Sequence, residues 1–100
     1  MTTKTRLEAL PDIPTIDEFV PGDEASSWQG IGAPRNTPTE IIDKLNNEIN
    51  SVLADPTVKA RLVALGGTAL AGSPADFAKL IANETEKWAK VIKSAGIKPE

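Results

Sequence analysis

The stretch from Ser27 to Glu40 separates two unlike parts of this chain. It reads SWQGIGAPRNTPTE, and it passes from small and apolar residues through Pro34 into a strong helix start. Before it, prolines at positions 11, 14 and 21 interrupt the sequence, so regular pairing of that backbone is not expected. After it, apolar residues recur at helical spacing. We therefore expect a proline-rich lead-in over residues 1–26 and a mainly helical unit over residues 27–100, which together form a single domain or a fragment of one.

Residues 28–33 are the best candidate for a strand. Because side chains alternate along a strand, Trp28 shares one face with Gly30 and Gly32, while Ile31 lies on the other face. Glycines inside a strand often mark a bend or the close approach of another backbone. Residues 68–71 form a second short apolar segment, which we expect to be either a short strand or a connector.

The first helix is predicted from a proline and a capping box. Thr37 is the expected N-cap, Pro38 the first helical residue, and Glu40 the residue that closes the box. The apolar residues that follow fall on a single stripe, which is typical of a helix with one buried face. That stripe consists of Ile41, Ile42, Leu45, Ile49, Val52 and Leu53.

Two further helices begin with a capping residue followed by a proline. Asp55 and Ser73 are these capping residues. We expect the second helix to end at Gly66 and the third to run to about Ala95, because glycines suit the residue after a helix. The stripe of the third helix consists of Phe77, Leu80, Ile81, Trp88, Val91 and Ile92. The expected fold class is therefore α+β and dominated by helices, with three helices and one or two short strands.

The lead-in is expected to be an ordered connector. Thr15 and Glu18 have the spacing of a capping box, which allows about one helical turn over residues 16–19. Ile13, Ile16 and Phe19 are the expected apolar anchors. Nearby acidic residues could bind Ca²⁺ through oxygen, but they lack EF-hand spacing, so a solvated acidic loop is favoured. These acidic residues are Asp17, Glu18, Asp23 and Glu24.

The composition argues against several classes of function. The net charge of −3 opposes nucleic-acid binding, which needs a positive surface against the phosphates. The chain has no cysteine and no histidine, so it lacks the usual nucleophile–base pairs and the commonest transition-metal ligands. A lone Gly-x-Gly at Gly30 lacks the third glycine of a dinucleotide-binding loop. We expect no cofactor, no metal and no enzymatic activity.

The sequence shows neither a membrane span nor an export signal. No apolar run approaches the ~20 residues that a spanning helix needs. Residues 1–10 lack the apolar region of a signal peptide. We therefore expect the sequence as printed to remain in the cytoplasm if it is expressed as it stands.

Two residues, Arg35 and Glu84, are candidates for contact with a ligand. Arg35 is the only cation near both the end of the predicted strand and the start of a helix, and a helix N-terminus favours anions. The alternative is that Arg35 is an ordinary loop arginine. Glu84 falls near the middle of an apolar stripe, where a carboxylate must find a partner or take up a proton. The alternatives for Glu84 are a structural bond to a Trp N–H, to backbone N–H groups or to Arg35, a ligand or acid–base role, and a position in water.

A string of motifs runs through nearly the whole chain. LPDIPTIDEF is followed by SWQGIGAPRNTPTEIIDKLNNEINSVLADPTVKARLVALGG and then by SPADFAKLIANETEKWAKVIKSAGIK. In this order the motifs resemble the C-terminal third of the Bug-type extracytoplasmic receptors of tripartite tricarboxylate transporters. The resemblance extends from about Arg6 to Lys98. The positions that carry it are Pro14, Thr15, Glu18, Trp28, Gly30, Ala33, Pro34, Thr37, Pro38, Leu45, Asn46, Glu84 and Trp88.

The resemblance implies part of a periplasmic-binding-protein-like α/β fold, in which two lobes close around a small carboxylate. It also implies delivery of that ligand to a membrane permease, a periplasmic location and no enzymatic activity. Such receptors are much longer than this chain. In such receptors the loops that bind the ligand carboxylate lie mostly outside the C-terminal third that this chain resembles.

Three hypotheses about function remain open. The chain is a receptor fragment without ligand affinity of its own, or half of a split receptor whose missing lobe is a second chain, or a small interaction or structural module. In each case the helices are expected to leave an apolar surface open. Self-association into a homo-oligomer, or a marginal fold, is the expected consequence.

Overall fold

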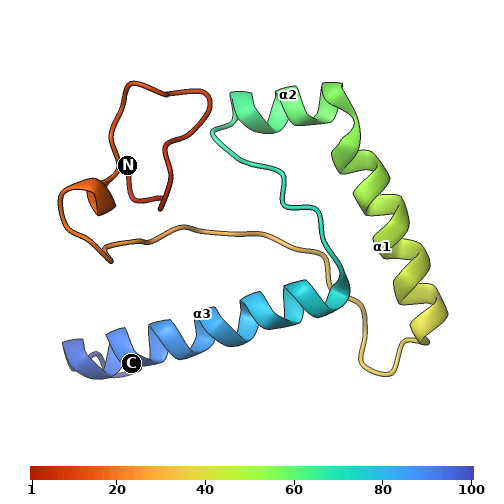
Figure 1. The fold of residues 1–100 in the computed structure, drawn as a ribbon. Helices are drawn as coiled ribbons and strands as arrows, with labels where there is room; N and C mark the ends of the chain where they lie inside the picture. The colour runs from red at the N-terminus through yellow and green to blue at the C-terminus, as the bar shows by residue number, and fades with distance from the viewer.

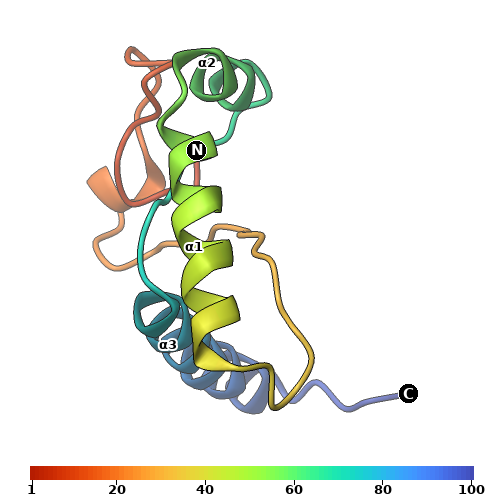
Figure 2. The ribbon, with the colours of Figure 1, turned by 90° about the vertical axis from the view of Figure 1, so that its right-hand side faces the viewer.

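The computed structural model describes residues 1–100 as three α-helices joined by extended segments (Figure 1). Helix α1 spans Thr39–Ala54, α2 spans Pro56–Ala64 and α3 spans Pro74–Ala95, and a single 3₁₀ turn, η1, covers Ile16–Glu18. The three predicted helices are confirmed. Helix α1 contacts both α2 and α3, whereas α2 and α3 do not contact each other. Figure 2 shows the same arrangement, with the N-terminal loop and α2 at one end and α3 at the other.

Helices α2 and α3 begin as the sequence predicts. The Asp55 carboxylate accepts hydrogen bonds from the backbone N–H groups of Thr57 and Val58, at 2.7 and 3.4 Å. At the start of α3, Ser73 and Asp76 exchange the two bonds of a capping box, at 3.1 and 2.9 Å. These bonds satisfy N–H groups that have no partner within the helix.

Helix α1 begins one residue later than predicted and lacks the predicted cap. Pro38 is extended, with φ −54° and ψ 140°, and only its carbonyl group joins the helix. The Thr37 hydroxyl donates a hydrogen bond of 2.7 Å to the carbonyl of Pro34. The capping box predicted from Thr37 to Glu40 is therefore wrong, because this hydroxyl closes the preceding turn instead.

The structure contains no β-strand, so the strand predicted at residues 28–33 and the possible one at 68–71 are both absent. Both segments are extended (Figure 1), yet residues 26–33 and 68–71 make no backbone–backbone hydrogen bond. A strand exists only beside a partner that satisfies its N–H and C=O groups. The α+β prediction is confirmed for the helices and wrong for the strands, because this chain offers neither segment a partner.

The helices enclose no hydrophobic core. No apolar residue is buried, and Thr15 is the only buried residue. The accessible surface is 8365 Å², whereas a compact chain of 10.6 kDa should expose about 5,500 Å². The radius of gyration is 16.5 Å, against about 13 Å for a compact domain of this length. The expected anchors of the lead-in, Ile13, Ile16 and Phe19, are themselves exposed, and that prediction is wrong.

None of the helices combines the length and the apolar character that a membrane span requires. Many large apolar side chains are exposed to solvent, and contiguous apolar surface drives association in water.

The first prediction concerns this exposed surface. The isolated chain should associate with itself as its concentration rises. If it stays monomeric, its free energy of unfolding should be low. Size-exclusion chromatography with light scattering across micromolar concentrations measures the first outcome, and urea unfolding followed by circular dichroism measures the second. A monomer at every concentration that also resists urea like an ordinary domain would contradict both.

Candidate functional site

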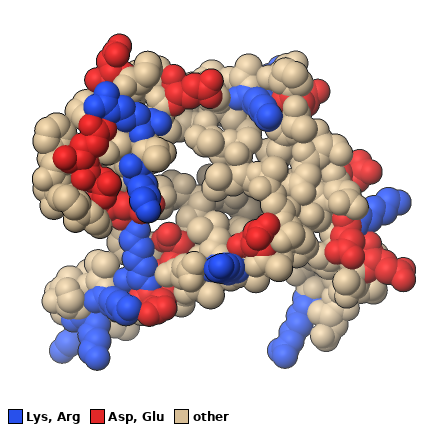
Figure 3. Space-filling view, viewed as in Figure 1, with Lys and Arg blue, Asp and Glu red and all other residues tan.

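Two hollows open between the helices and the extended segments. The larger, of about 740 Å³, is bordered by residues 3–9, by residues 66–70 and by Glu84 of α3. The smaller, of about 390 Å³, lies between residues 28–33, helix α1 and the start of α3. Figure 3 shows an opening through the molecule, and the atoms around it are mostly neither acidic nor basic.

The smaller hollow is an apolar groove. Its walls include four residues of the stripe predicted for the first helix, Ile42, Leu45, Ile49 and Leu53, but only Phe77 and Leu80 of the stripe predicted for the third. Residues 28–33 and Leu70 complete the lining. Most of the α1 stripe and the start of the α3 stripe thus face a common space, but nothing in this chain fills that space. We call this hollow the apolar groove.

An aromatic contact holds the extended segment at the groove. The rings of Trp28 and Phe77 meet edge to face, with centroids 5.6 Å apart and planes at 85°. Gly30 lies against the same ring, and a Cβ built at Gly30 would overlap the Phe77 side chain. A Cβ at Gly32 would meet nothing within 4 Å. The close neighbour at Gly30 is therefore a side chain, not the second backbone that the glycines were predicted to admit, and Gly32 has no close neighbour.

Two asparagines of α1 fasten the second extended segment. The side-chain amides of Asn46 and Asn50 each donate a hydrogen bond of 2.9 Å to the carbonyl of Gly72. The Asn50 carbonyl oxygen accepts from the Gly72 N–H at 3.3 Å. We did not predict this clamp. The sequence contained a signal for it. Side-chain amides at i and i+4 share one helix face, and Asn46 and Asn50 directly follow Leu45 and Ile49 of the apolar stripe.

Glu84 is half-buried at the edge of the larger hollow. Its Oε2 accepts a hydrogen bond of 2.9 Å from Trp88 Nε1. A bond to a Trp N–H was one of the alternatives considered for this carboxylate, and it is the one that the structure contains. The neighbouring Lys87 donates to the carbonyl of Glu24 at 2.7 Å and lies 5.6 Å from the centre of the Trp88 ring. Helix α3 is thereby fastened to the end of the lead-in.

Arg35 lies in the turn before α1, and its side chain makes neither a hydrogen bond nor an ion pair. It is exposed and does not line either hollow. Figure 1 shows this turn well apart from the middle of α3, where Glu84 lies. The structure therefore does not bring the two candidate ligand residues together.

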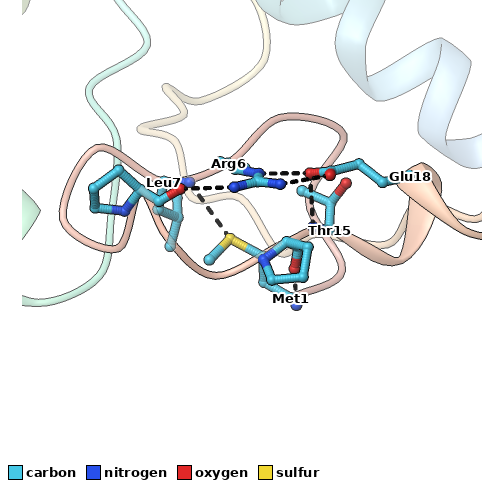
Figure 4. A network of polar contacts seen from close by, with 7 residues as sticks. Met1, Arg6, Leu7, Thr15 and Glu18 are labelled. Carbon is cyan, nitrogen blue, oxygen red and sulfur yellow. Dashed lines mark hydrogen bonds and ion pairs between the residues drawn. The ribbon is translucent and has the colours of Figure 1, made fainter.

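An ion pair closes the N-terminal loop, which is one wall of the larger hollow (Figure 4). The Arg6 guanidinium donates two hydrogen bonds of 2.7 Å to the Glu18 carboxylate and a third of 3.0 Å to the carbonyl of Pro11. Glu18 also accepts from the Thr15 N–H at 3.2 Å, which is one of the two bonds of the predicted capping box. The Thr15 hydroxyl, which should make the other bond, is buried without a partner. The bonds from Arg6 and Thr15 lower the pKa of Glu18 to about 2, and the side-chain hydrogen bond from Arg6 is the largest cause.

The acidic residues of the lead-in do not converge. No group of three carboxylates in the structure is placed to hold a metal ion. The Asp17 carboxylate instead accepts from the Gly22 N–H at 2.8 Å, and Glu18 is paired with Arg6. The geometry shows that Asp17 and Glu18 close loops of the backbone locally.

Comparison with known sequences extends over almost the whole chain. The sequence pattern of the family described as "Tripartite tricarboxylate transporter family receptor" matches residues 1–97. A UPF0065 protein of Bordetella bronchiseptica is 36% identical over 99 residues, which are 99% of this chain and 30% of that protein. The protein BugT of Bordetella pertussis is 35% identical over 90 residues, which are 89% of this chain and 28% of BugT. These matches agree with the resemblance carried by the motifs.

Two solved structures contain the same arrangement of backbone. R. palustris Rpa4515, determined with adipate, superposes with a TM-score of 0.86 and 41% identity over 99% of this chain and 33% of its own. The periplasmic binding protein BugD superposes with a TM-score of 0.83 and 33% identity over 99% of this chain and 34% of its own. This chain therefore spans about a third of the length of the solved relatives, and the arrangement described here occurs within longer proteins.

The second prediction tests the contact between Gly30 and Phe77. Gly30→Ala should destabilise the chain by about 1–3 kcal/mol, because the added methyl group overlaps a ring that Trp28 holds in place. Gly32→Ala is the matched control, with open space for its methyl group, and should change stability by less than about 1 kcal/mol. Thermal unfolding followed by circular dichroism compares the two. Equal melting temperatures for the two variants would contradict the close packing.

The third prediction concerns the pKa of Glu18. Its depressed pKa means that the Arg6 contact stabilises the fold above the ordinary pKa of 4.5, and that this stabilisation is lost as the pH falls toward 2. In Arg6→Ala the pKa of Glu18 should return toward its ordinary value, as measured by NMR titration of the carboxyl carbon. Ser73→Ala is the control, because it should raise the pKa of Asp76, which the Ser73 bonds lower, and leave Glu18 unchanged. Overlapping Glu18 titrations in Arg6→Ala and the parent chain would contradict the assignment.

Proposed function

Since this chain belongs to the tripartite tricarboxylate transporter receptor family, we propose that it contributes one part of a periplasmic receptor that binds a small carboxylate and delivers it to a membrane permease. The family is one of solute receptors, not of enzymes. The observation that carries the proposal is the superposition of almost the entire chain on Rpa4515, whose structure contains adipate. A dicarboxylate of that kind is accordingly the first ligand to test.

Ligand binding should require the remainder of a receptor. A carboxylate is held by several converging donors, such as a bidentate arginine or backbone N–H groups. In this chain Arg6 is already paired with Glu18, and Arg35 lies alone on an exposed turn. Glu84 borders the larger hollow, but a carboxylate accepts hydrogen bonds and offers no donor to an anion. We therefore propose that the chain has no appreciable affinity for carboxylates by itself.

A second candidate function is that of a protein-interaction module, including half of a split receptor. The observation that favours it is the open apolar groove, whose lining would be buried in an ordinary domain. The two candidates differ in what they require, because a receptor must bind a carboxylate after assembly and an interaction module need not.

The fourth prediction separates the two candidates by calorimetry. Adipate, a tricarboxylate and an acidic amino acid should each give no binding heat with the isolated chain. At least one should bind when this chain replaces the aligned third of Rpa4515 in a single chimeric chain. Binding by the isolated chain would contradict the need for a second part. A folded chimera that binds none of the three would favour the interaction module.

The same chimera tests the two candidate ligand residues. If Arg35 contacts the carboxylate, Arg35→Gln should weaken binding by about tenfold or more, because a charge-assisted hydrogen bond is lost. Glu84→Gln can still accept from Trp88 and serves as the matched comparison. Unchanged affinity in Arg35→Gln would remove Arg35 from the ligand site, and a change in Glu84→Gln alone would move the site to the larger hollow.

A further inference from the structure

We propose that Lys87 is a positioning residue, which holds the N-terminal loop, residues 1–25, against helix α3 and thereby sets the opening of the larger hollow. We call its hydrogen bond to the carbonyl of Glu24 the latch. The inference rests on the proposed function, because a relative adopts the latched arrangement of backbone in a structure that contains adipate. In this role Lys87 orders two parts of the chain and does not touch the ligand.

The N-terminal loop is a self-contained part of the structure. Arg6 pairs with Glu18 inside it, and the Ala25 N–H donates to the Thr2 carbonyl at 2.8 Å and closes its end. Its one helical turn, η1, contacts none of the three helices. Parts of a chain that share no large apolar interface move relative to each other by default. The position of the loop therefore depends on the few contacts that join it to the helices.

The latch is the one polar contact of this kind. Lys87 Nζ donates to the carbonyl of Glu24 at 2.7 Å, across 63 positions of sequence. No other hydrogen bond and no ion pair joins residues 1–26 to residues 27–100. The donor carries a charge, which strengthens the bond, and the acceptor belongs to the backbone. The bond therefore fixes the loop itself and not merely a mobile side chain on it.

The surroundings of Lys87 hold its side chain in place. Its ammonium group lies 5.6 Å from the centre of the Trp88 ring, within the range of a cation–π contact. Trp88 is in turn held by the 2.9 Å bond from its Nε1 to Glu84. Lys87 is half-buried, whereas Lys90 and Lys93 of the same helix are exposed. Lys87 thus differs from the lysines of the solvated face.

The latch lies at the border of the larger hollow. Glu24 and Glu84 both line that hollow, together with residues 3–9 of the N-terminal loop and residues 66–70 of the helical part. The two walls thus belong to the two parts that the latch joins. Loss of the bond frees one wall to move away from the other, so the width of the hollow depends on Lys87.

The comparison with Rpa4515 indicates which arrangement the latch favours. The superposition covers 99% of this chain, so it includes the N-terminal loop as well as the helices, and that structure contains adipate. A contact that stabilises the binding-competent arrangement raises the apparent affinity for ligand, because only the competent fraction of the molecules binds. The latch should therefore strengthen carboxylate binding in an assembled receptor.

Distances between two spin labels test the latch in this chain without ligand. The chain has no cysteine, so Asp12→Cys on the loop and Ala64→Cys on α2 provide two unique and exposed attachment sites. Lys87→Met keeps the length of the side chain and removes the donor. We expect the distance distribution from pulsed electron resonance to become at least about twice as broad in this variant, because the loop is released.

Lys90→Met is the matched control. It removes the same charge from the same helix, but Lys90 pairs only with Glu86, one turn away. Its distance distribution should equal that of the parent chain, and Lys87→Arg should restore a narrow distribution because it keeps a charged donor. Equal distributions for Lys87→Met and Lys90→Met would overturn the proposal.

Adipate binding tests the consequence in the chimera that carries this chain in place of the aligned third of Rpa4515. Lys87→Met should weaken adipate binding by about threefold to tenfold, through loss of one charge-assisted hydrogen bond. Lys90→Met should leave the affinity unchanged, and Lys87→Arg should recover most of it. Circular dichroism checks the helices of every variant. If Lys87→Met unfolds the isolated chain, these affinities decide, and an unchanged affinity overturns the proposal.

The two measurements separate failure of the latch from failure of the proposed function. A parent chimera that binds no carboxylate rejects the receptor, and the label distances still decide whether Lys87 holds the loop. A parent chimera that binds adipate with equal strength in Lys87→Met and Lys90→Met rejects the latch and keeps the receptor.

Discussion

The burial of apolar surface is the constraint on which this structure depends, and the chain cannot satisfy it alone. Its helices carry apolar stripes, but most of the α1 stripe and the start of the α3 stripe border an open groove. Burial is the dominant favourable term in folding, and it must offset about 1–2 kcal/mol of backbone entropy for each ordered residue. With no buried apolar residue, that offset has to come from outside the chain. The lack of a buried core accounts together for the exposed stripes, the unpaired extended segments and the large surface.

Polar contacts define the arrangement of the elements in place of a core. The clamp of Asn46 and Asn50 on Gly72 sets the position of the segment before α3, and Arg6 with Glu18 closes the N-terminal loop. Such bonds are directional, so they can fix which segment lies beside which helix. Each contributes only about 0.5–1.5 kcal/mol net in ordinary cases, and exposed ion pairs contribute less. They specify a geometry that packing against a partner would then stabilise.

The sequence predicted what is local and missed what depends on neighbours. Caps involve residues two or three apart, so Asp55 and Ser73 defined helix starts that the structure confirms. The strand at 28–33 was wrong because pairing is not a property of the segment itself. The Thr37 cap was wrong because the hydroxyl had a competing acceptor in Pro34. At the candidate site, a Trp N–H was one of several alternatives left open for Glu84, and the structure shows that it is Trp88, four residues on. Arg35 has no partner within this chain.

Assembly and ligand binding are thermodynamically linked if only the assembled receptor binds a carboxylate. A ligand that binds one state stabilises that state by about 2.7 kcal/mol at a concentration of 100 Kd. A chain that is marginal alone would then be held in its complex partly by its ligand, and loss of ligand would expose the apolar groove again. The same exposed groups that make the isolated chain prone to association would make the complex responsive to ligand. Rigid-body closure around a preformed lobe would not show this dependence, because a lobe with its own core stays folded whether or not ligand is present.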